Sequence, residues 1–540
     1  MSSTPLNDPQ LVEQTTTVAV EEKAKLRRNF RRFDMLLFTV CALVGLDTLG
    51  TVSKKGPEAF FWLVLLAVIF LLPYALLMAE VGSAFTLEGG PYEWMKMAWG
   101  RMAASLGAML YWVTNPIWVG GTLVLTATAA FQTNFADLNR GKITLWGDHS
   151  VYLLSFLFGL TFIWLSIVVA IVSLDKGKWI PNIGAIGRFV VLGLFSLTVV
   201  IYAIKNGLHN TPALSSYNPF NGGWGPGITL ALGIVPVILF NYVGFELQNG
   251  AAEEMVNPQR DVPVTVIRSG IISVIAYVIP IFGIIAVLPA SKVSGLSGFM
   301  DSVGQVFTVY GGASGAMVKF ATVLFILALM TSGAVWMIGS DRVAAIAAAD
   351  GGAPRFFGVF SARFGTPVRV NVTSGIVSTI FFIAATIVFT GGQGAQLFLV
   401  VLYLATSTTL LSYLLIFPAV WKLRITHGHV KRPYRFPGGY NALKGAVILC
   451  TAFMLLGSWV ALFPGLLENW VGGSYVWTDN WSISRAQFEA FTLGTLAVFL
   501  VIALIGYAMG APTRRESVAL NLDLSEPVLA PDGQQAVLGD

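Results

Sequence analysis

The sequence is short of charged residues. Asp, Glu, Lys and Arg make up 11% of its 540 residues, whereas 55% are hydrophobic. A water-soluble protein carries about a quarter charged residues, and one of this length divides into several domains. So little charge excludes an ordinary soluble protein, because this much apolar surface is stable only when lipid surrounds it.

The motifs of several function classes are missing too. The chain has no Walker-type phosphate loop, which excludes ATP as the fuel, and no nucleophile elbow or Cys–His arrangement of a hydrolase. Its four histidines have no acid or cysteine at ligand spacing, and its net charge of +5 is spread over loops. We therefore expect no enzyme, no metal, no cofactor and no nucleic acid partner. Cys41 and Cys450, the two cysteines, lie in apolar runs and are interpreted as free thiols.

Long apolar runs fill most of the chain. Each is near or above the ~20 residues that a membrane-spanning helix needs, so the sequence predicts an all-α integral membrane protein with twelve transmembrane helices. The first thirty residues lack the apolar core of a cleavable signal peptide. The predicted spans are 34–53, 58–85, 103–132, 151–174, 183–204, 227–250, 264–289, 313–346, 370–390, 394–421, 443–465 and 488–510.

The distribution of basic residues sets the orientation. With a cytoplasmic N-terminus, 25 of the 33 Lys and Arg residues fall on the cytoplasmic side of twelve spans. Cytoplasmic loops are enriched in Lys and Arg, so this bias predicts that both termini are cytoplasmic. Residues 1 to about 24 and the acidic tail beyond about 512 are polar, and we expect them to be disordered. We place the protein in the plasma (inner) membrane.

Two of the predicted spans are interrupted. The first contains Gly45, Asp47 and Gly50, and the sixth contains Asn241, Gly244 and Glu246. Glycine weakens a helix, and a carboxyl group inside the bilayer needs a partner or a cavity. The alternative is that the glycines only permit close helix packing and that Asp47 is a structural hydrogen-bonding residue.

The two interrupted spans lie five spans apart. A five-plus-five inverted repeat places spans one and six at matching positions, where a substrate site lies near the middle of the membrane. The N-termini of half-helices suit a carboxylate, whereas exposed carbonyls and a side-chain acid suit an ammonium group. A zwitterionic amino acid satisfies both.

The chain resembles the amino acid–polyamine–organocation permeases over most of its length, with some similarity to their glutamate/GABA antiporter branch around the first span. The order and spacing of several motifs along the twelve spans carry this resemblance. They are 79–82, 88–94, 242–246, 252–263, 339–343, 349–354 and 432–439.

The resemblance implies a LeuT-type fold with alternating access and a substrate between spans one, three, six, eight and ten. The division it implies is a basic N-terminal tail (1–33), a transporter domain (34–510) and a C-terminal tail (511–540). Within the domain, repeat one covers about 34–204, repeat two about 227–421, and helices 11 and 12 about 443–510.

Candidate site residues follow from the breaks and from the resemblance. Arg188 stands near where proton-coupled relatives have a lysine that replaces a sodium ion; alternatively, it reaches the headgroups. A polar segment after span six and Arg188 form the coupling and gating group: Arg188, Glu253, Glu254, Arg260 and Asp261. The substrate-binding candidates are Val44, Gly45, Asp47, Thr48, Asn115, Asn241, Tyr242, Gly244, Glu246, Trp336 and Tyr403.

The sequence thus predicts a secondary active transporter of an amino acid or related amine, working as an exchanger or as a proton-linked symporter. A transporter-like sensor or a channel is the alternative from another class. Polar residues cluster at two breaks instead of forming a continuous stripe, which favours the transporter. The substrate, the involvement of protons and the choice between a monomer and a homodimer stay open.

Overall fold

The structure is a computed structural model that describes residues 16–26, 28–146, 149–172, 179–208, 211–388, 394–481 and 483–515. Within these ranges the chain is helical except for loops and one small hairpin. The helices that fall in predicted spans are α3 (Arg32–Leu43), α4 (Leu49–Lys54), α5 (Gly56–Leu66), η2 (Ala67–Leu71), α6 (Leu72–Ala84), α8 (Arg101–Trp118), η3 (Val119–Leu123), α9 (Val124–Asn134), α10 (Leu153–Val172), α11 (Trp179–Asn206), α12 (Trp224–Tyr242), η5 (Leu247–Glu254), α13 (Pro258–Val287), α15 (Ser314–Ala349), α16 (Val368–Val388), α17 (Gly394–Thr426), α18 (Gly439–Leu462) and α21 (Arg485–Met509).

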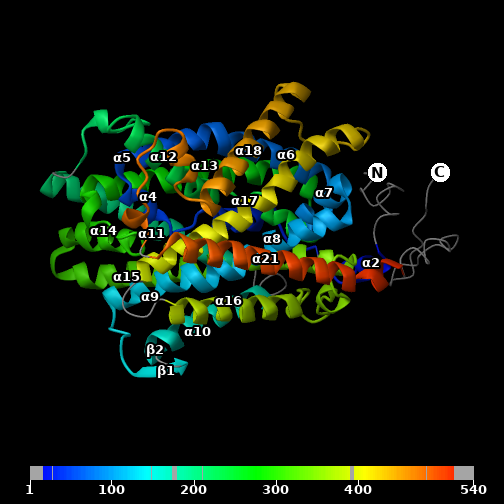
Figure 1. Ribbon diagram of the computed structural model, residues 1–540, viewed down its shortest axis with the longest axis horizontal. Helices are drawn as coiled ribbons and strands as arrows, with labels where there is room; N and C mark the ends of the chain where they lie inside the picture. The colour runs from blue at the N-terminus through cyan, green and yellow to red at the C-terminus, as the bar shows by residue number, and fades with distance from the viewer. Residues whose placement is uncertain are drawn as a thin grey trace.

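Shorter elements connect them. They are α2 (Thr17–Lys23), α7 (Gly90–Trp99), β1 (Lys142–Trp146), β2 (His149–Tyr152), η4 (Leu214–Ser216), η6 (Ala290–Lys292), α14 (Gly298–Val306), η7 (Phe307–Ala313), η8 (Arg355–Gly358), α19 (Leu466–Trp470) and α20 (Trp477–Asn480). The strands β1 and β2 pair antiparallel, with Lys142 opposite Tyr152. They form a hairpin that projects from the helical body (Figure 1).

Ten segments of the described chain are long and apolar enough to cross a membrane, and they confirm ten of the twelve predicted spans. The two others differ for separate reasons. The predicted span 34–53 is split into α3 and α4. In α16 the apolar helix of 368–384 is shorter than a full span. The protein is therefore a multi-pass membrane protein.

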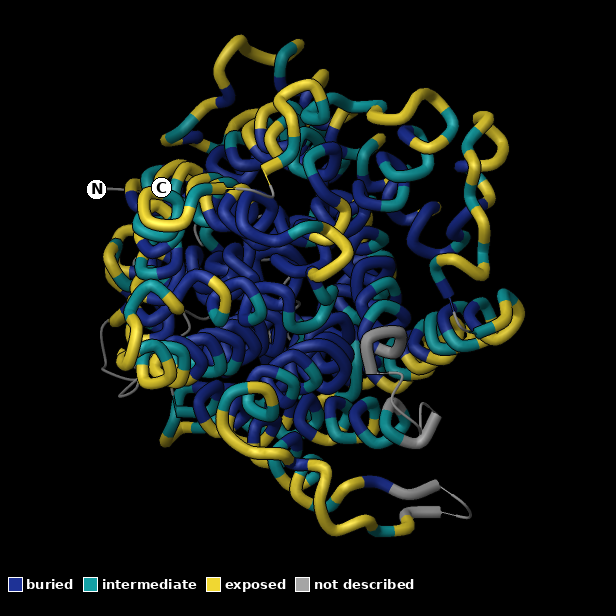
Figure 2. Tube along the Cα trace, turned by 90° about the vertical axis from the view of Figure 1, so that its left-hand side faces the viewer, coloured by how far each residue is buried: buried dark blue, intermediate teal, exposed yellow. Residues whose placement is uncertain are grey.

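The helices surround a buried centre. Seen along the long axis, buried residues gather in the middle and exposed ones form the periphery (Figure 2). The long helix α15 packs against α8, α10 and α11, and α17 packs against α8 and α18. Apolar side chains at the periphery, such as Ile271, Ile275 and Ile279 on α13, are at least half exposed. An outward-facing apolar row of this kind is stable against lipid and not against water.

The N-terminal region corrects one expectation. We expected disorder up to about residue 24, but residues 17–23 form α2. Its side chains Val18 and Ala19 are buried against Ala349 at the end of α15. The cause is tertiary: Thr16 caps α2 and also donates a hydrogen bond to the Ala349 carbonyl, 2.7 Å away. The expected disorder of the C-terminal tail is also wrong for residues 511–515, which are helical. The expected disorder of residues 1–15 and 516–540 lies outside the described residues.

The described chain ends meet at one end of the molecule. Thr16 donates its backbone N–H to Asp350 (3.2 Å), and Arg514 donates to the neighbouring Gly351 carbonyl. Figure 1 shows α2 and the last turns of α21 together at the right-hand end. Both described ends therefore lie at the same end of the helical body. The two cysteines are free and buried, which confirms their interpretation.

Candidate functional site

The first helix break lies between α3 and α4, at residues 44–48. Backbone groups released by the break are bound by side chains of other helices. Tyr277 of α13 accepts a hydrogen bond from Gly45 N–H and donates one to the Leu43 carbonyl, both 2.8 Å long. Trp336 of α15 donates to the Ala42 carbonyl at 2.9 Å. Neighbouring helices thus provide the partners that non-helical backbone needs at membrane depth.

The second break follows α12, at residues 243–246, and continues as the 3₁₀-helix η5. Gly244 has φ +130°, a conformation that L side chains rarely adopt. A Cβ atom there would also stand 2.9 Å from the Trp336 ring. The phenol oxygen of Tyr74 accepts the N–H groups of Gly244 (2.8 Å) and Phe245 (3.1 Å). Both interruptions are therefore where the sequence predicts them.

Asp47 occupies the first break and faces a cavity. Trp118 donates its indole N–H to Oδ2 at 2.8 Å, whereas Oδ1 is buried without a hydrogen bond. The amide Nδ2 of Asn241 is also buried without one, while its Oδ1 accepts from Thr48 at 2.8 Å. A cavity of about 20 Å³, near the size of one water molecule, lies here. Its lining is Ala42, Leu43, Gly45, Asp47, Thr114, Asn115, Trp118, Phe240, Asn241, Tyr277, Trp336 and Thr409.

Glu246 occupies the second break and is enclosed by phenols. Tyr111 and Tyr413 donate to Oε1 at 2.8 and 2.6 Å, and Tyr74 donates to Oε2. These tyrosines come from α8, α17 and α6, so the carboxyl group joins three helices to the break. Glu246 is fully buried and does not line the cavity beside Asp47. Its surroundings provide the hydrogen bonds that a buried carboxyl group requires.

Arg188 joins three helices next to the first break. Its Nη2 donates to the Ala328 carbonyl at 2.8 Å and to the Ser332 hydroxyl. Ser332 in turn donates to the Cys41 carbonyl of α3 at 3.1 Å. Arg188 is fully buried, so the alternative that it reaches the lipid headgroups is wrong. The guanidinium places a permanent positive charge between α11 and α15, with Ser332 as the link to α3.

Similarity to known proteins covers most of the chain. The sequence model of the family described as amino acid permease matches residues 30–478, which is most of the chain. This chain belongs to the amino acid permease family. The resemblance found in the sequence is thereby confirmed.

Three relatives of this permease illustrate its range. A probable agmatine/putrescine antiporter from Lactococcus lactis is 30% identical over 77% of this chain and 84% of its own length. An uncharacterized transporter from Legionella pneumophila is 27% identical over 87% and 94%. A glutamate/gamma-aminobutyrate antiporter from Lactococcus lactis is 24% identical over 79% and 83%. The family and these relatives are transporters.

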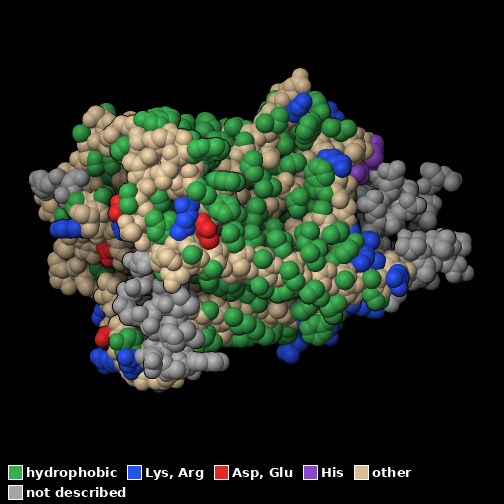
Figure 3. Space-filling view, viewed as in Figure 1, with side chains coloured by type: hydrophobic (Ala, Val, Ile, Leu, Met, Phe, Trp, Pro, Cys, Tyr) green, Lys and Arg blue, Asp and Glu red, His purple; other side chains and the backbone are tan. Residues whose placement is uncertain are grey.

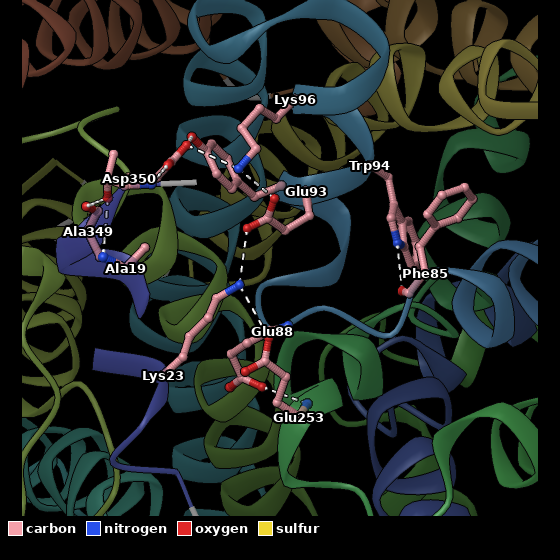
Figure 4. A network of polar contacts seen from close by, with 12 residues as sticks. Ala19, Lys23, Phe85, Glu88, Glu93, Trp94, Lys96, Glu253, Ala349 and Asp350 are labelled. Carbon is pink, nitrogen blue, oxygen red and sulfur yellow. Dashed lines mark hydrogen bonds and ion pairs between the residues drawn. The ribbon is translucent and has the colours of Figure 1, made fainter. Parts of the chain in front are cut away.

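A polar network covers the end of the permease where the described chain ends meet. Lys23 of α2 lies 3.3 Å from Glu253 on η5 and 3.4 Å from Glu93 on α7 (Figure 4). Lys96 lies 2.7 Å from Glu93 and 3.3 Å from Asp350. One short N-terminal helix thus connects the segment after the second break to α7 and to the end of α15.

A second group of ion pairs lies beside this network. Arg342 of α15 lies 2.8 Å from Glu254 and 3.5 Å from Glu88. The backbone N–H groups of Glu88 and Glu253 each donate to the other's carboxylate at 3.1 Å. In the first turn of α13, Asp261 accepts a hydrogen bond of 2.6 Å from Arg32. These contacts hold the segment that follows the second break against α7 and α15.

Burial and neighbouring charges shift the pKa values of three groups around this network. Burial lowers the pKa of Lys23, but the carboxylates of Glu253 and Glu93 outweigh burial and raise it above its usual value. The ammonium group of Lys23 therefore stays charged at physiological pH. Burial raises the pKa of Glu88, with Glu254 adding to the rise and Arg342 opposing it. Burial would raise the pKa of Asp350 as well, but Lys96 and Arg101 hold it below its usual value.

The structure brings together part of the predicted site. Gly45, Asp47, Asn115, Asn241 and Trp336 line one cavity. Among the other candidates, Val44 ends α3, Thr48 bonds to Asn241, and Gly244 packs against Trp336.

Other candidates lie away from the cavity. The phenol of Tyr242 donates to the Leu63 carbonyl at 2.8 Å, and that of Tyr403 donates to the Gly233 carbonyl at 3.1 Å. The Tyr403 ring packs on Trp481, with ring centres 5.1 Å apart. Arg260 is exposed, and the ion pairs around the network involve Glu253, Glu254 and Asp261.

Several residues of the site were not among the candidates. Trp118 and Phe240 line the cavity, Tyr277 binds the first break, and Tyr74 and Tyr413 bind Glu246. The three tyrosines could have been recognised as candidates from the sequence, because each lies inside a predicted span. A phenol at membrane depth needs a hydrogen-bond partner, and non-helical backbone and a buried acid are such partners.

Proposed function

We propose that this permease is a secondary transporter that exchanges amines or amino acids across the plasma membrane by alternating access. The observation that carries the proposal is Asp47, which lines a cavity at a helix break and has one buried carboxyl oxygen without a hydrogen bond. A carboxyl group at this depth is retained where a ligand or a partner group uses it. An ammonium group of the substrate supplies both a positive charge and hydrogen-bond donors.

The lining favours a substrate with a net positive charge. Asp47 is the only charged side chain among the residues that line the cavity. Four aromatic side chains also line the cavity: Trp118, Phe240, Tyr277 and Trp336. Aromatic rings attract ammonium groups through their negative faces. An agmatine- or putrescine-like amine suits this lining, and one relative is a probable agmatine/putrescine antiporter.

A zwitterionic or acidic amino acid is the second candidate. The glutamate/gamma-aminobutyrate antiporters among the relatives favour it. In such a substrate the carboxylate would bind at the N-terminus of a half-helix, α4 or η5. The side-chain amide of Asn241, with its unbonded Nδ2, is a further donor at this place.

The closed cavity supports movement between states. A volume of about 20 Å³ is too small for an amine or an amino acid, so a substrate enters only if the two breaks separate. The network around Lys23 closes the side of the site that carries both described chain ends. The bias of basic residues identifies that side as the cytoplasm. We infer a LeuT-type arrangement of twelve spans, in which α3–α4 and α12–η5 are the paired discontinuous helices of the two repeats.

Arg188 bears on the coupling mechanism. An arginine stays protonated at physiological pH, so it cannot release a proton in each cycle. The buried guanidinium therefore acts as a fixed charge that holds α3 through Ser332. This favours exchange, in which one substrate replaces another, over a mechanism with a proton carried by residue 188.

The experiment is a counterflow assay on purified protein in liposomes. Vesicles are loaded in turn with putrescine, agmatine, single amino acids or buffer, and uptake of each labelled compound is measured. We expect uptake of a labelled amine that is several times faster when amine is present inside. Absence of uptake of every amine and every amino acid would contradict the proposal. Uptake that does not depend on internal substrate would reject exchange.

A further inference from the structure

A second and larger cavity lies between α8, α15, α16 and α21. Its volume is about 470 Å³, a size typical of small-molecule sites. It is hollow because small side chains face it from several helices. They include Ala108 on α8, Ala347 on α15, and Ala503 and Gly506 on α21. It shares no lining residue with the cavity beside Asp47.

The polar side chains in this cavity are already satisfied. The hydroxyl of Ser105 donates to the Arg101 carbonyl at 2.7 Å, and that of Thr373 donates to the Arg369 carbonyl at 2.8 Å. The indole N–H of Trp112 lies 2.9 Å from Asp341 and donates to it. The lining therefore offers hydrocarbon surface and no free side-chain donor, which suits an aliphatic chain.

The cavity opens toward the bilayer. On its α21 side Ile502, Ile505 and Met509 are 46%, 54% and 61% exposed. Only 22% of the most apolar stretch of α21 is buried. Figure 3 shows the same face as Figure 1, with a continuous apolar surface where α21 and α16 run. Acyl chains are the molecules that surround such a surface in a membrane.

Arginines lie next to lining residues at the end of the cavity where the described chain ends meet, and among the described residues no acid forms an ion pair with them. Arg514 donates to the carbonyls of Gly351 and Tyr507 and lies 3.9 Å above the Tyr507 ring. Arg369 donates to the Phe356 carbonyl at 3.1 Å and lies 4.5 Å above the Phe356 ring. Arg515 is exposed. Aromatic rings and carbonyl groups are neutral partners, so they do not offset the positive charge of these arginines.

We propose that this cavity binds one acyl chain of an anionic phospholipid, with the headgroup phosphate at the arginine rim. Basic pockets between transmembrane helices on the cytoplasmic side suit anionic headgroups. The lipid would fill the space between α21 and the pair α8 and α15. Trp112 connects this cavity to Asp341 on α15. The next residue, Arg342, forms the ion pairs beside the network around Lys23. Through this connection the lipid stabilises the closed packing of α15. The proposal does not depend on which substrate is transported.

The test measures lipid binding on purified full-length protein, without transport. Thermal unfolding in detergent is followed with added phosphatidylglycerol or phosphatidylcholine of the same chain length. We expect phosphatidylglycerol to raise Tm by several degrees and phosphatidylcholine to raise it less. The variant Ala503→Phe fills the cavity and should lose the shift with both lipids. Leu504→Phe adds a ring at the neighbouring, 43% exposed position and should keep it.

Charge variants test the rim separately. Arg369→Gln combined with Arg515→Gln should remove the advantage of phosphatidylglycerol and leave the hydrocarbon contribution. If Ala503→Phe does not fold, native mass spectrometry of the wild type and of this double variant counts the retained phosphatidylglycerol instead.

Three outcomes would overturn the proposal. One is equal stabilisation by the two lipids in the wild type, and another is an unchanged shift in Ala503→Phe. The third is a change of oligomeric state in Ala503→Phe without any lipid effect, which would assign the cavity to an interface between two copies.

Discussion

Asp47 and Glu246 stand at the two helix breaks and are both buried, yet their oxygens are used differently. Three phenols from three helices bind the carboxyl group of Glu246. Asp47 lines the cavity; Trp118 donates to one of its carboxyl oxygens, and the other is buried without a hydrogen bond. The comparison teaches that a polar residue at a helix break is not in itself a binding residue. A carboxyl group with all its partners holds helices together, whereas one with a free oxygen can bind a ligand.

The largest expected effect comes from closing the second break. Gly244→Leu should abolish uptake while the protein is still produced, because φ +130° is unsuited to leucine and its Cβ would stand 2.9 Å from Trp336. Liposome uptake and membrane abundance measure the two quantities. Gly233→Leu on the preceding helix α12 is the control, since a Cβ there meets nothing within 4 Å. Normal uptake by Gly244→Leu would show that the two breaks need not be in close contact.

Removal of the charge at Asp47 should have the next largest effect. Asp47→Asn keeps an oxygen for Trp118 but loses the partner of an ammonium group. We expect the KM of amine uptake to rise about tenfold or more, equivalent to about 1.4 kcal/mol of binding free energy. Asp137→Asn in an exposed loop is the matched control. Unchanged KM and pH dependence would make Asp47 a structural residue.

The same change at Glu246 should act mainly on stability. Glu246→Gln disturbs hydrogen bonds to three phenols, so we expect the free energy of unfolding to fall by about 1–3 kcal/mol. KM should change less than about threefold, because Glu246 does not line the cavity. Thermal unfolding and uptake are measured side by side, with Tyr111→Phe removing one of the three bonds. A large rise in KM at constant Tm would remove the distinction between the two acids.

The smallest effect is expected at the cytoplasmic network. Lys23→Gln leaves Glu93 and Glu253 without the ammonium group between them, which favours opening on this side. We expect uptake to change less than about threefold, while a cysteine introduced on η5 becomes labelled faster. Arg28→Gln, at an exposed position of the same segment, should leave labelling unchanged. Identical labelling rates in both variants would show that α2 does not hold this side closed.

Hydropathy and loop charge predicted a good part of the fold. The ten confirmed spans were found because a helix must be long and apolar to cross lipid. The breaks were found because Gly45, Asp47, Gly244 and Glu246 are unsuited to a simple membrane helix. The helix α2 was missed because its few apolar residues are stable only against Ala349, more than three hundred residues away.

The sequence by itself determined that this is a multi-pass membrane protein of the permease family and where its two helices are interrupted. These properties depend on composition and on local order along the chain. Only the tertiary structure decided that Glu246 is enclosed by Tyr74, Tyr111 and Tyr413, and that Asp47 keeps a free oxygen beside a cavity. Hydrogen bonds between helices distant in the sequence depend on how the helices pack, and no local pattern records that packing.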